Sequence, residues 1–494
     1  MKFALKKPAR LIATALLALS ALQAQALEMK GMVEKTIISN PEVRYRFHEF
    51  RAAAEETGIG RAGYMPTLDI GYAAGREKNN EPLVNNGPQI NSDFNRNGWS
   101  ANLAQNLFQG FQTWYTVNQL EAGKRGKYYD FLDASEQMGL EASRTYLDVL
   151  RYRELLELAK DSYAIHKGIY DQLEQKVKAG VGRRVDLEQA AGRLALSETN
   201  MINEASNLHD VSARYFRLLG EEPPANLAPA PSLKDKLPQD KDLLVTAVRS
   251  SPSYLAALEN LTAAKSDVNV KRGAFSPTVD LRARKEQGDN LNGTLGRHER
   301  QMIELAFNFN LFRGNADKAR LSAAAERYNS ALDLRDKACR DLQQNVRIAN
   351  NDVRKLNEQM AYLRQHALST EKARDAYLKQ FDIGQRSLLD VLDSENELYE
   401  SKRALSNAEY DNKLAQVRVL ASSGLLLSSL QIKPIEQYNF DASADEEERN
   451  ACSTQYTPPP AFDKSSIQVK PYISTTLVNP TAAPGKKASK TNPS

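Results

Sequence analysis

The chain contains 494 residues, with 66 Lys and Arg against 62 Asp and Glu, so its formal net charge is +4. The first segment, residues 1–26, supplies this whole surplus, because it holds no acid and four basic residues: Lys2, Lys6, Lys7 and Arg10. The remaining chain is formally neutral. This argues against a body that binds nucleic acid, since phosphate binding needs an excess of cations.

Residues 1–26 have the three parts of a secretory signal peptide. A cationic start precedes an apolar stretch over 11–22, and Ala24-Gln25-Ala26 forms an A-x-A cleavage site. The apolar stretch is too short for a bilayer, which needs ~20 residues. We predict an exported chain that begins near Leu27, with a short amphipathic anchor helix as the alternative. Beyond the signal peptide, no apolar run is long enough to predict a membrane-spanning helix.

Proline is unevenly distributed, and its gaps predict very long helices. None occurs between Pro88 and Pro223, or between Pro277 and Pro434. Proline is costly inside a helix, and both gaps are rich in helix-forming residues with apolar positions three and four apart. The pattern predicts two long and two shorter helices, at about 113–179, 315–381, 186–219 and 390–423. Each long helix would extend about 100 Å, at 1.5 Å per residue.

Motifs recur in the same order along the chain, which indicates an internal duplication. Five motifs of the first half match the second half at offsets of 211 or 204 residues: Asn40-Pro41 with Ser251-Pro252, Tyr64-Met65-Pro66-Thr67 with Phe275-Ser276-Pro277-Thr278, Leu107-Phe108-Gln109-Gly110 with Leu311-Phe312-Arg313-Gly314, Gly180 and Asp186 with Gly384 and Asp390, and Gly220 with Gly424. Each repeat is expected to contain a helix, a β-hairpin, a long helix and a further helix. We predict this division: signal peptide 1–26, first repeat 27–220, proline-rich linker 221–250, second repeat 251–430 and tail 431–494.

Apolar and polar residues alternate in the strands of both predicted hairpins. The pattern is clear over 279–284 and 303–311, and weaker over 68–74 and 99–107. Transmembrane β-barrels use this period, and so do soluble antiparallel sheets with one buried face. Both interpretations stay open on the pattern alone. Since a membrane barrel needs about eight strands, the membrane interpretation requires several copies of the chain.

The signal peptide, the duplicated helix–hairpin–helix units, the strands that end in L-F-x-G and the glycine six residues before an aspartate resemble the TolC family of outer-membrane efflux and secretion channels. The resemblance covers about 30–430 and is most specific over Phe381–Asp393. It implies a mixed α+β fold in a homotrimer. Four strands per chain would form one 12-stranded outer-membrane β-barrel, continuous with a long periplasmic α-helical barrel built from the two tandem repeats.

By the same resemblance, the helix tips form a periplasmic gate. Asp390 and Asp393 match paired aspartate rings that narrow the entrance and favour cations, as carboxylate rings do in pores. Arg386 and Asp186 match residues of the polar links that hold the tips closed. The alternative for the two ring aspartates is that they only stabilise the first turn of a helix, by ~0.3–1 kcal/mol.

Two positions depart from the family's pattern. Phe381 stands where the family has a gate tyrosine, which removes a hydroxyl, and Val185 stands where threonine is frequent. Arg183 and Arg184 are additional cations beside the predicted gate. They either pair with the ring aspartates or remain solvated.

The resemblance also implies partners. A periplasmic adaptor (membrane fusion) protein would contact the helix tips over about 176–190 and 380–394, where three glycines mark the turns: Gly180, Gly182 and Gly384. An inner-membrane pump, either an ABC exporter or a proton-driven pump, would supply energy, and outer-membrane lipid would surround the strands. No motif for a catalytic site, a metal or a cofactor is present.

The sequence therefore favours a passive exit duct in the bacterial outer membrane that extends into the periplasm and is not an enzyme. We favour type I protein secretion, because no cysteine follows the signal peptide to carry the lipid anchor common in drug-efflux relatives. The outer-membrane channel of a multidrug pump is an alternative, and a periplasmic coiled-coil scaffold or adaptor is the alternative from another class. Cys339 and Cys452 either form a bridge or stay free. The tail is predicted to be partly disordered.

Overall fold

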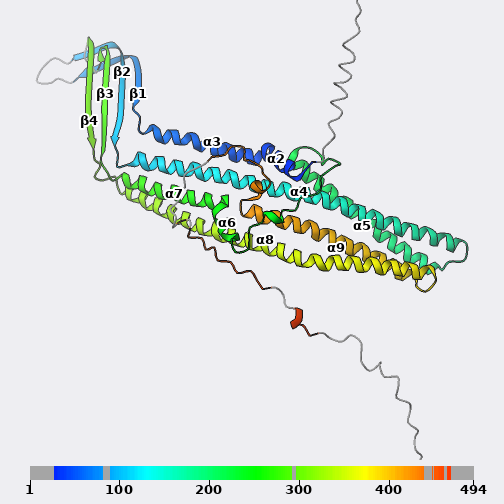
Figure 1. Cartoon of the computed structure of the whole chain (residues 1–494). Coiled ribbons are helices and arrows are strands. Elements are labelled where there is room, and N and C mark those ends of the chain that lie inside the picture. Colours follow the sequence, from blue (N-terminus) through cyan, green and yellow to red (C-terminus); the bar gives the residue numbers. More distant parts are fainter. Residues whose placement is uncertain are drawn as a thin grey trace, which may run out of the picture. The chain divides into compact units, whose positions relative to one another are not determined.

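The computed structural model describes residues 27–81, 90–291, 296–438, 448, 450–460 and 464–468 (Figure 1). These residues belong to two units, which divide after Gln455. The second unit contains a short 3₁₀ helix, η3 (Lys464–Ser466), and the first contains the elements described below. The predicted signal peptide lies outside the described residues.

The first half of the chain contains two helices, a β-hairpin and two further helices. Its elements are α2 (Met29–Ser39), α3 (Pro41–Ala62), β1 (Thr67–Glu81), β2 (Ile90–Phe108), α4 (Gln112–Lys178) and α5 (Arg184–Leu219). The side chain of Asn40 caps α3 by accepting from the N–H of Glu42, and Pro41 begins the helix where its missing N–H costs nothing. α4 has 67 residues, which confirms the first predicted long helix.

The second half repeats this order after a short 3₁₀ helix, η1 (Lys234–Lys236). Its elements are α6 (Leu243–Ser250), α7 (Pro252–Gly273), β3 (Thr278–Asp289), β4 (Arg297–Asn308), α8 (Ala316–Asp382), α9 (Leu388–Ser422) and α10 (Leu426–Ser429). α8 also has 67 residues, so the second predicted long helix is confirmed. Gly220 and Gly424, which the sequence matches to each other, both have a left-handed backbone just after α5 and α9, with φ of 73° and 67°.

The long helices of the first unit pack against shorter helices from both halves. Next to the strands, α4 contacts α3 and α7, and farther from the strands it contacts α5 and α9 (Figure 1). α8 contacts α7 and α6 and then α9. The main apolar core lies where α2, α3, α4, α5, α9 and α10 meet, and its largest fully buried side chains include Tyr146, Phe131 and Phe50.

A buried carboxylate holds the end of the second repeat to α4. Glu136 accepts hydrogen bonds from the N–H groups of Leu426, at 3.1 Å, and Leu427, at 3.3 Å. Burial raises the pKa of Glu136 to about 8, against the opposing effect of these two bonds. The turn that follows α9 is thus fixed at a point along the middle of α4.

The four strands form one antiparallel sheet in the order β1-β2-β3-β4. β2 and β3 join the two hairpins, with Leu103 opposite Ala283, and a register shift falls between Asn106 and Phe108. Since strand partners in register share a face, the alternation gathers apolar side chains of all four strands on one face: Leu68, Ile70, Tyr72, Trp99, Ala101, Leu103, Val279, Leu281, Ala283, Ile303, Leu305 and Phe307. Gln105, opposite Leu281, and Lys285, opposite Ala101, interrupt this face.

This apolar face is largely uncovered in the described part of the single chain. Ile303 is 80% exposed, Ile70 76% and Phe307 67%. A soluble sheet with one buried face would cover these side chains, so the sheet of one chain does not have that arrangement. A contiguous apolar surface normally contacts lipid or another protein chain.

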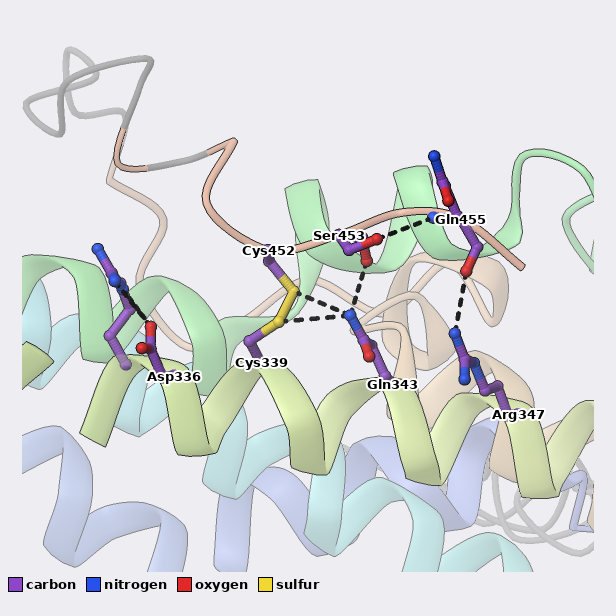
Figure 2. The surroundings of a disulfide bond; sticks show 8 residues. Asp336, Cys339, Gln343, Arg347, Cys452, Ser453 and Gln455 are labelled. Carbon is purple, nitrogen blue, oxygen red and sulfur yellow. Dashed lines mark hydrogen bonds and ion pairs between the residues drawn. A yellow bond between two sulfur atoms is a disulfide. The ribbon is translucent and has the colours of Figure 1, made fainter. Parts of the chain in front are cut away.

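A disulfide joins Cys339 in α8 to Cys452, which decides between the two alternatives for these cysteines (Figure 2). Gln343, one turn farther along α8, donates to the carbonyl oxygen of Ser453 at 2.7 Å. Arg347 donates to the carbonyl oxygen of Gln455 at 2.9 Å. Because Cys452 is also buried, the segment 452–455 is held along α8 by one covalent bond and two hydrogen bonds.

Removal of this disulfide should destabilise the folded chain. The bond joins residues separated by 113 positions, and loss of a disulfide typically costs about 2–4 kcal/mol, more for longer loops. The double variant Cys339→Ser, Cys452→Ser should therefore show a lower Tm in detergent, measured by circular dichroism. Wild-type protein refolded under reductant is the control and should approach the variant's Tm. An unchanged Tm would contradict this prediction.

Candidate functional site

The turn between α4 and α5 is a tight loop that requires two glycines. Gly180 has a left-handed backbone, with φ of 75°. The N–H groups of Val181 and Gly182 then both donate to the carbonyl oxygen of Lys176, at 3.0 Å each. A Cβ at Gly182 would lie 2.9 Å from the backbone nitrogen of Val177, so any side chain there would displace the loop.

The turn between α8 and α9 begins in the same way. Gly384 also has φ of 75°, and the N–H of Gln385 donates to the carbonyl oxygen of Gln380 at 2.8 Å. Glycine is the residue best suited to this left-handed position after a helix. The structure therefore places Gly180, Gly182 and Gly384 in the two helix tips.

Asp390 caps the helix α9 on which it lies. Its carboxylate accepts from the hydroxyl of Ser387 at 2.8 Å and from the Ser387 N–H at 3.1 Å. The N–H of Asp390 donates in return to the Ser387 hydroxyl, which completes a capping box. The Ser387 hydroxyl, the Ser387 N–H and then the nearby charge of Arg386 hold the pKa of Asp390 below its usual value. Asp390 thus has the helix-stabilising role that the sequence left as an alternative, and its charge persists at neutral pH.

The guanidinium of Arg386 contacts three side chains of its own helical hairpin. It lies over the ring of Tyr377, 4.2 Å from the ring centre, which is a favourable position for a cation. It donates to the side chain of Gln380 at 2.9 Å and lies 3.9 Å from the carboxylate of Asp390. Arg386 and Asp390, four residues apart, are therefore brought together at this tip.

Asp393 instead pairs with the other repeat. Its carboxylate accepts a hydrogen bond from the guanidinium of Arg193 in α5. Asp186 stays within its own tip, where Arg183 donates to it at 3.2 Å, and Arg184 lies 4.0 Å from Glu188. Asp393 therefore pairs with Arg193, and not with Arg183 or Arg184, which the sequence suggested as partners for the two aspartates.

Phe381 lies in a small apolar cluster just above the tips. The cluster has a buried centre of Ala190, Leu388 and Leu392, with Phe381 packed against it together with side chains of α4. It joins the ends of all four helices, so the aromatic ring contributes packing where a tyrosine hydroxyl would contribute a polar link.

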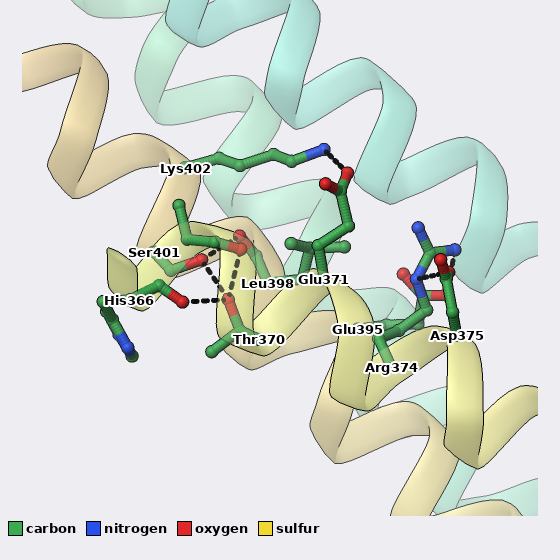
Figure 3. Close-up of polar contacts among 10 residues, drawn as sticks. His366, Thr370, Glu371, Arg374, Asp375, Glu395, Leu398, Ser401 and Lys402 are labelled. Atoms are coloured by element: carbon green, nitrogen blue, oxygen red, sulfur yellow. Dashed lines mark hydrogen bonds and ion pairs between the residues drawn. The ribbon is translucent and has the colours of Figure 1, made fainter. Parts of the chain in front are cut away.

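A polar layer farther from the tip ties α8 to α9 (Figure 3). Thr370 and Ser401 share a hydrogen bond of 2.8 Å, and Lys402 donates to Glu371 at 3.0 Å. Arg374 donates at 3.2 Å to Glu395, whose carboxylate is buried. A buried charge is costly unless it is paired, so this ion pair favours one alignment of the two helices.

Sequence reasoning missed three residues that shape the tips. Ser387 had a local signal, because Ser387 and Asp390 have the spacing of a capping box. Tyr377 and Arg193 had none, because the partner of Tyr377 depends on how the chain turns after α8 and the partner of Arg193 depends on which helices lie side by side. Within the part of the chain that the structure describes, no cluster of metal-ligating side chains and no helix apolar enough to cross a membrane is present.

A comparison with known protein families identifies the family to which this chain belongs. The family model described as "Outer membrane efflux protein" matches residues 32–221 and 243–425. The chain belongs to the outer membrane efflux protein family. The TolC-like resemblance is thereby confirmed, and the protein is located in the outer membrane with an extension into the periplasm.

Individual relatives resemble most of the chain. It is 24% identical over 418 residues to the outer membrane efflux protein BepC of Brucella suis, covering 83% of this chain and 89% of the relative. It is 22% identical over 458 residues to the outer membrane protein TolC of Escherichia coli, covering 88% and 91%. The crystal structure of the Campylobacter jejuni CmeC outer membrane channel has the same fold, with a TM-score of 0.73 at 19% identity over 83% of this chain and 87% of that one. The relatives are outer-membrane channel proteins, which indicates a transport role.

The capping box predicts a pH-dependent effect at the tip. Because the pKa of Asp390 is lowered in the folded chain, its stabilising contribution is present at neutral pH and is lost as the pH falls through that lowered value. Ser387→Ala should lower the Tm at about pH 7, and the difference from wild type should shrink toward about pH 3. Ser387→Thr keeps the hydroxyl and is the control. A difference that does not vary with pH would count against this assignment.

Proposed function

We propose that this chain is the exit duct of a tripartite export machine. Three copies would each give four strands to one 12-stranded barrel, and their long helices would form a hollow periplasmic barrel. The supporting observation is the sheet itself, which exposes an apolar face and, in the described residues, leaves β1 and β4 without outer strand partners. Open edges are not tolerated in lipid, so additional copies are required to close the sheet.

The dimensions of the sheet agree with this proposal. Strands β1 to β4 contain 15, 19, 12 and 12 residues, and a tilted membrane strand needs about 9–11. A single chain supplies half of the smallest barrel of about eight strands. A periplasmic scaffold or adaptor, the alternative from another class, would leave the exposed apolar face without a partner.

The duct would conduct passively, with energy supplied by an inner-membrane ABC exporter or proton-driven pump. We favour type I protein secretion. Relatives include the alkaline protease secretion protein AprF of Pseudomonas aeruginosa, 23% identical over 452 residues. Multidrug or small-molecule efflux is the second candidate, because relatives also include BepC and the pyoverdine export outer membrane protein OpmQ.

The helix tips would form the gate and the adaptor contact. In a trimer, Asp390 and Asp393 would repeat three times around the mouth and attract cations, while Arg386, Asp186 and Phe381 would hold neighbouring helices together. The turns at Gly180, Gly182 and Gly384 leave apolar side chains such as Val181 and Ile383 exposed, as a protein contact requires. No cofactor is needed for any of these roles.

The assembly is tested by purification and planar-bilayer recording. The full chain should require detergent, migrate as a trimer and form ion-conducting pores. A monodisperse monomer in plain buffer would refute the duct. A deletion strain then separates the two cargo classes: loss of one large secreted protein with unchanged drug tolerance supports secretion, and increased drug sensitivity supports efflux.

The gate is tested by charge removal. Asp390→Ala with Asp393→Ala should weaken the preference for cations, because the mouth would lose up to six carboxylates in a trimer. The measurement is the reversal potential of single pores in a salt gradient. Glu409→Ala, an exposed acid of α9 far from the tip, is the control and should leave the potential unchanged. Unaltered selectivity in the double variant would refute the aspartate rings.

A further inference from the structure

The two helix tips of one chain carry opposite charge. Residues 180–193 contain three arginines and two acids, whereas the matching residues 384–397 contain one arginine and four acids. At the offset of 204 that relates the repeats, Arg193 corresponds to Glu397. Each tip contains a glycine turn, but the first tip has a net positive charge and the second a net negative charge.

The opposite charges meet through one ion pair near the tips. The guanidinium of Arg193 donates to the carboxylate of Asp393, and both side chains are partly exposed. Farther along the same two helices, Arg403 of α9 donates to the buried carboxylate of Glu204 in α5 at 2.9 Å. Since residue numbers rise together along both helices, α5 and α9 run parallel away from the tips and are joined at two levels.

The two predicted ring acids are therefore not equivalent. Asp393 has a guanidinium in direct hydrogen-bond contact from another helix. Asp390 is bound by the neutral Ser387, and its nearest described arginine, Arg386, lies 3.9 Å away and is shared with Tyr377 and Gln380. A paired acid and base act at a distance as a dipole, whose field falls off faster than that of a single charge.

We propose that Arg193 sets the charge of the channel mouth by neutralising Asp393, so that Asp390 supplies most of the cation preference. This inference rests on the proposed channel function and assigns a selectivity-tuning role to a residue of the first repeat. If Arg193 only held the two helices together, its replacement would change stability alone. The proposed role predicts that replacement of Arg193 also changes which ions pass through the channel.

The test is the reversal potential of single wild-type and variant pores in a gradient of about 0.1 M salt, at which screening acts over about 10 Å. Arg193→Gln should shift the potential toward greater cation preference, and Asp393→Asn should shift it the opposite way. The double variant Arg193→Gln, Asp393→Asn should return close to wild type, because a neutral pair is replaced by a neutral pair. Arg193→Lys keeps the charge and should behave like wild type.

Arg364→Gln is the matched control. Arg364 of α8 pairs with Glu409 of α9 at 3.2 Å, and both are exposed, so this variant removes the same charge from a pair far from the tip. It should leave the potential unchanged. If Arg193→Gln leaves the selectivity unchanged, or if Arg364→Gln shifts it equally, the role of Arg193 is overturned while the channel stands. If the wild type forms no pores, both proposals are overturned.

Discussion

The structure depends on a constraint that one chain cannot satisfy alone. Its sheet has an apolar face and, in the described residues, two edges without outer partners, and lipid does not tolerate unpaired backbone groups. The two hairpins are joined through β2 and β3, so one chain carries a continuous four-stranded sheet rather than two separate hairpins. The long helices follow directly from the strand ends, and their lateral order is therefore set by the order of the strands.

Helices of 67 residues are too long to be stabilised at their ends alone. In the first unit, shorter helices cover them in two sections, with α3 and α7 next to the strands and α5 and α9 toward the tips. Specific bonds lie where the two sections of each long helix meet. Glu136 holds the turn after α9 to α4, and the disulfide at Cys339 holds the segment 452–455 to α8. These bonds connect a middle part of each long helix to segments that follow α9.

The helix tips show how one local turn can support different chemistry. Both use a glycine with φ of 75° after the long helix. The first tip pairs Arg183 with Asp186, whereas the second forms a capping box between Ser387 and Asp390. The capping role and a role in ion selectivity are compatible, because the cap lowers the pKa of Asp390 and so keeps its carboxylate charged. A helix cap and a charged ring can therefore use the same side chain.

The sequence by itself determined the features that depend on local spacing. Proline gaps predicted the long helices, alternation predicted the strands, and repeated motifs located the glycine turns, because each of these is encoded within a few residues. The tertiary structure alone decided the partners. Arg193 pairs with Asp393 across 200 positions, Phe381 enters an apolar cluster, and Cys339 bonds to Cys452. Such contacts depend on which helices lie side by side, and a single sequence carries no local signal for that arrangement.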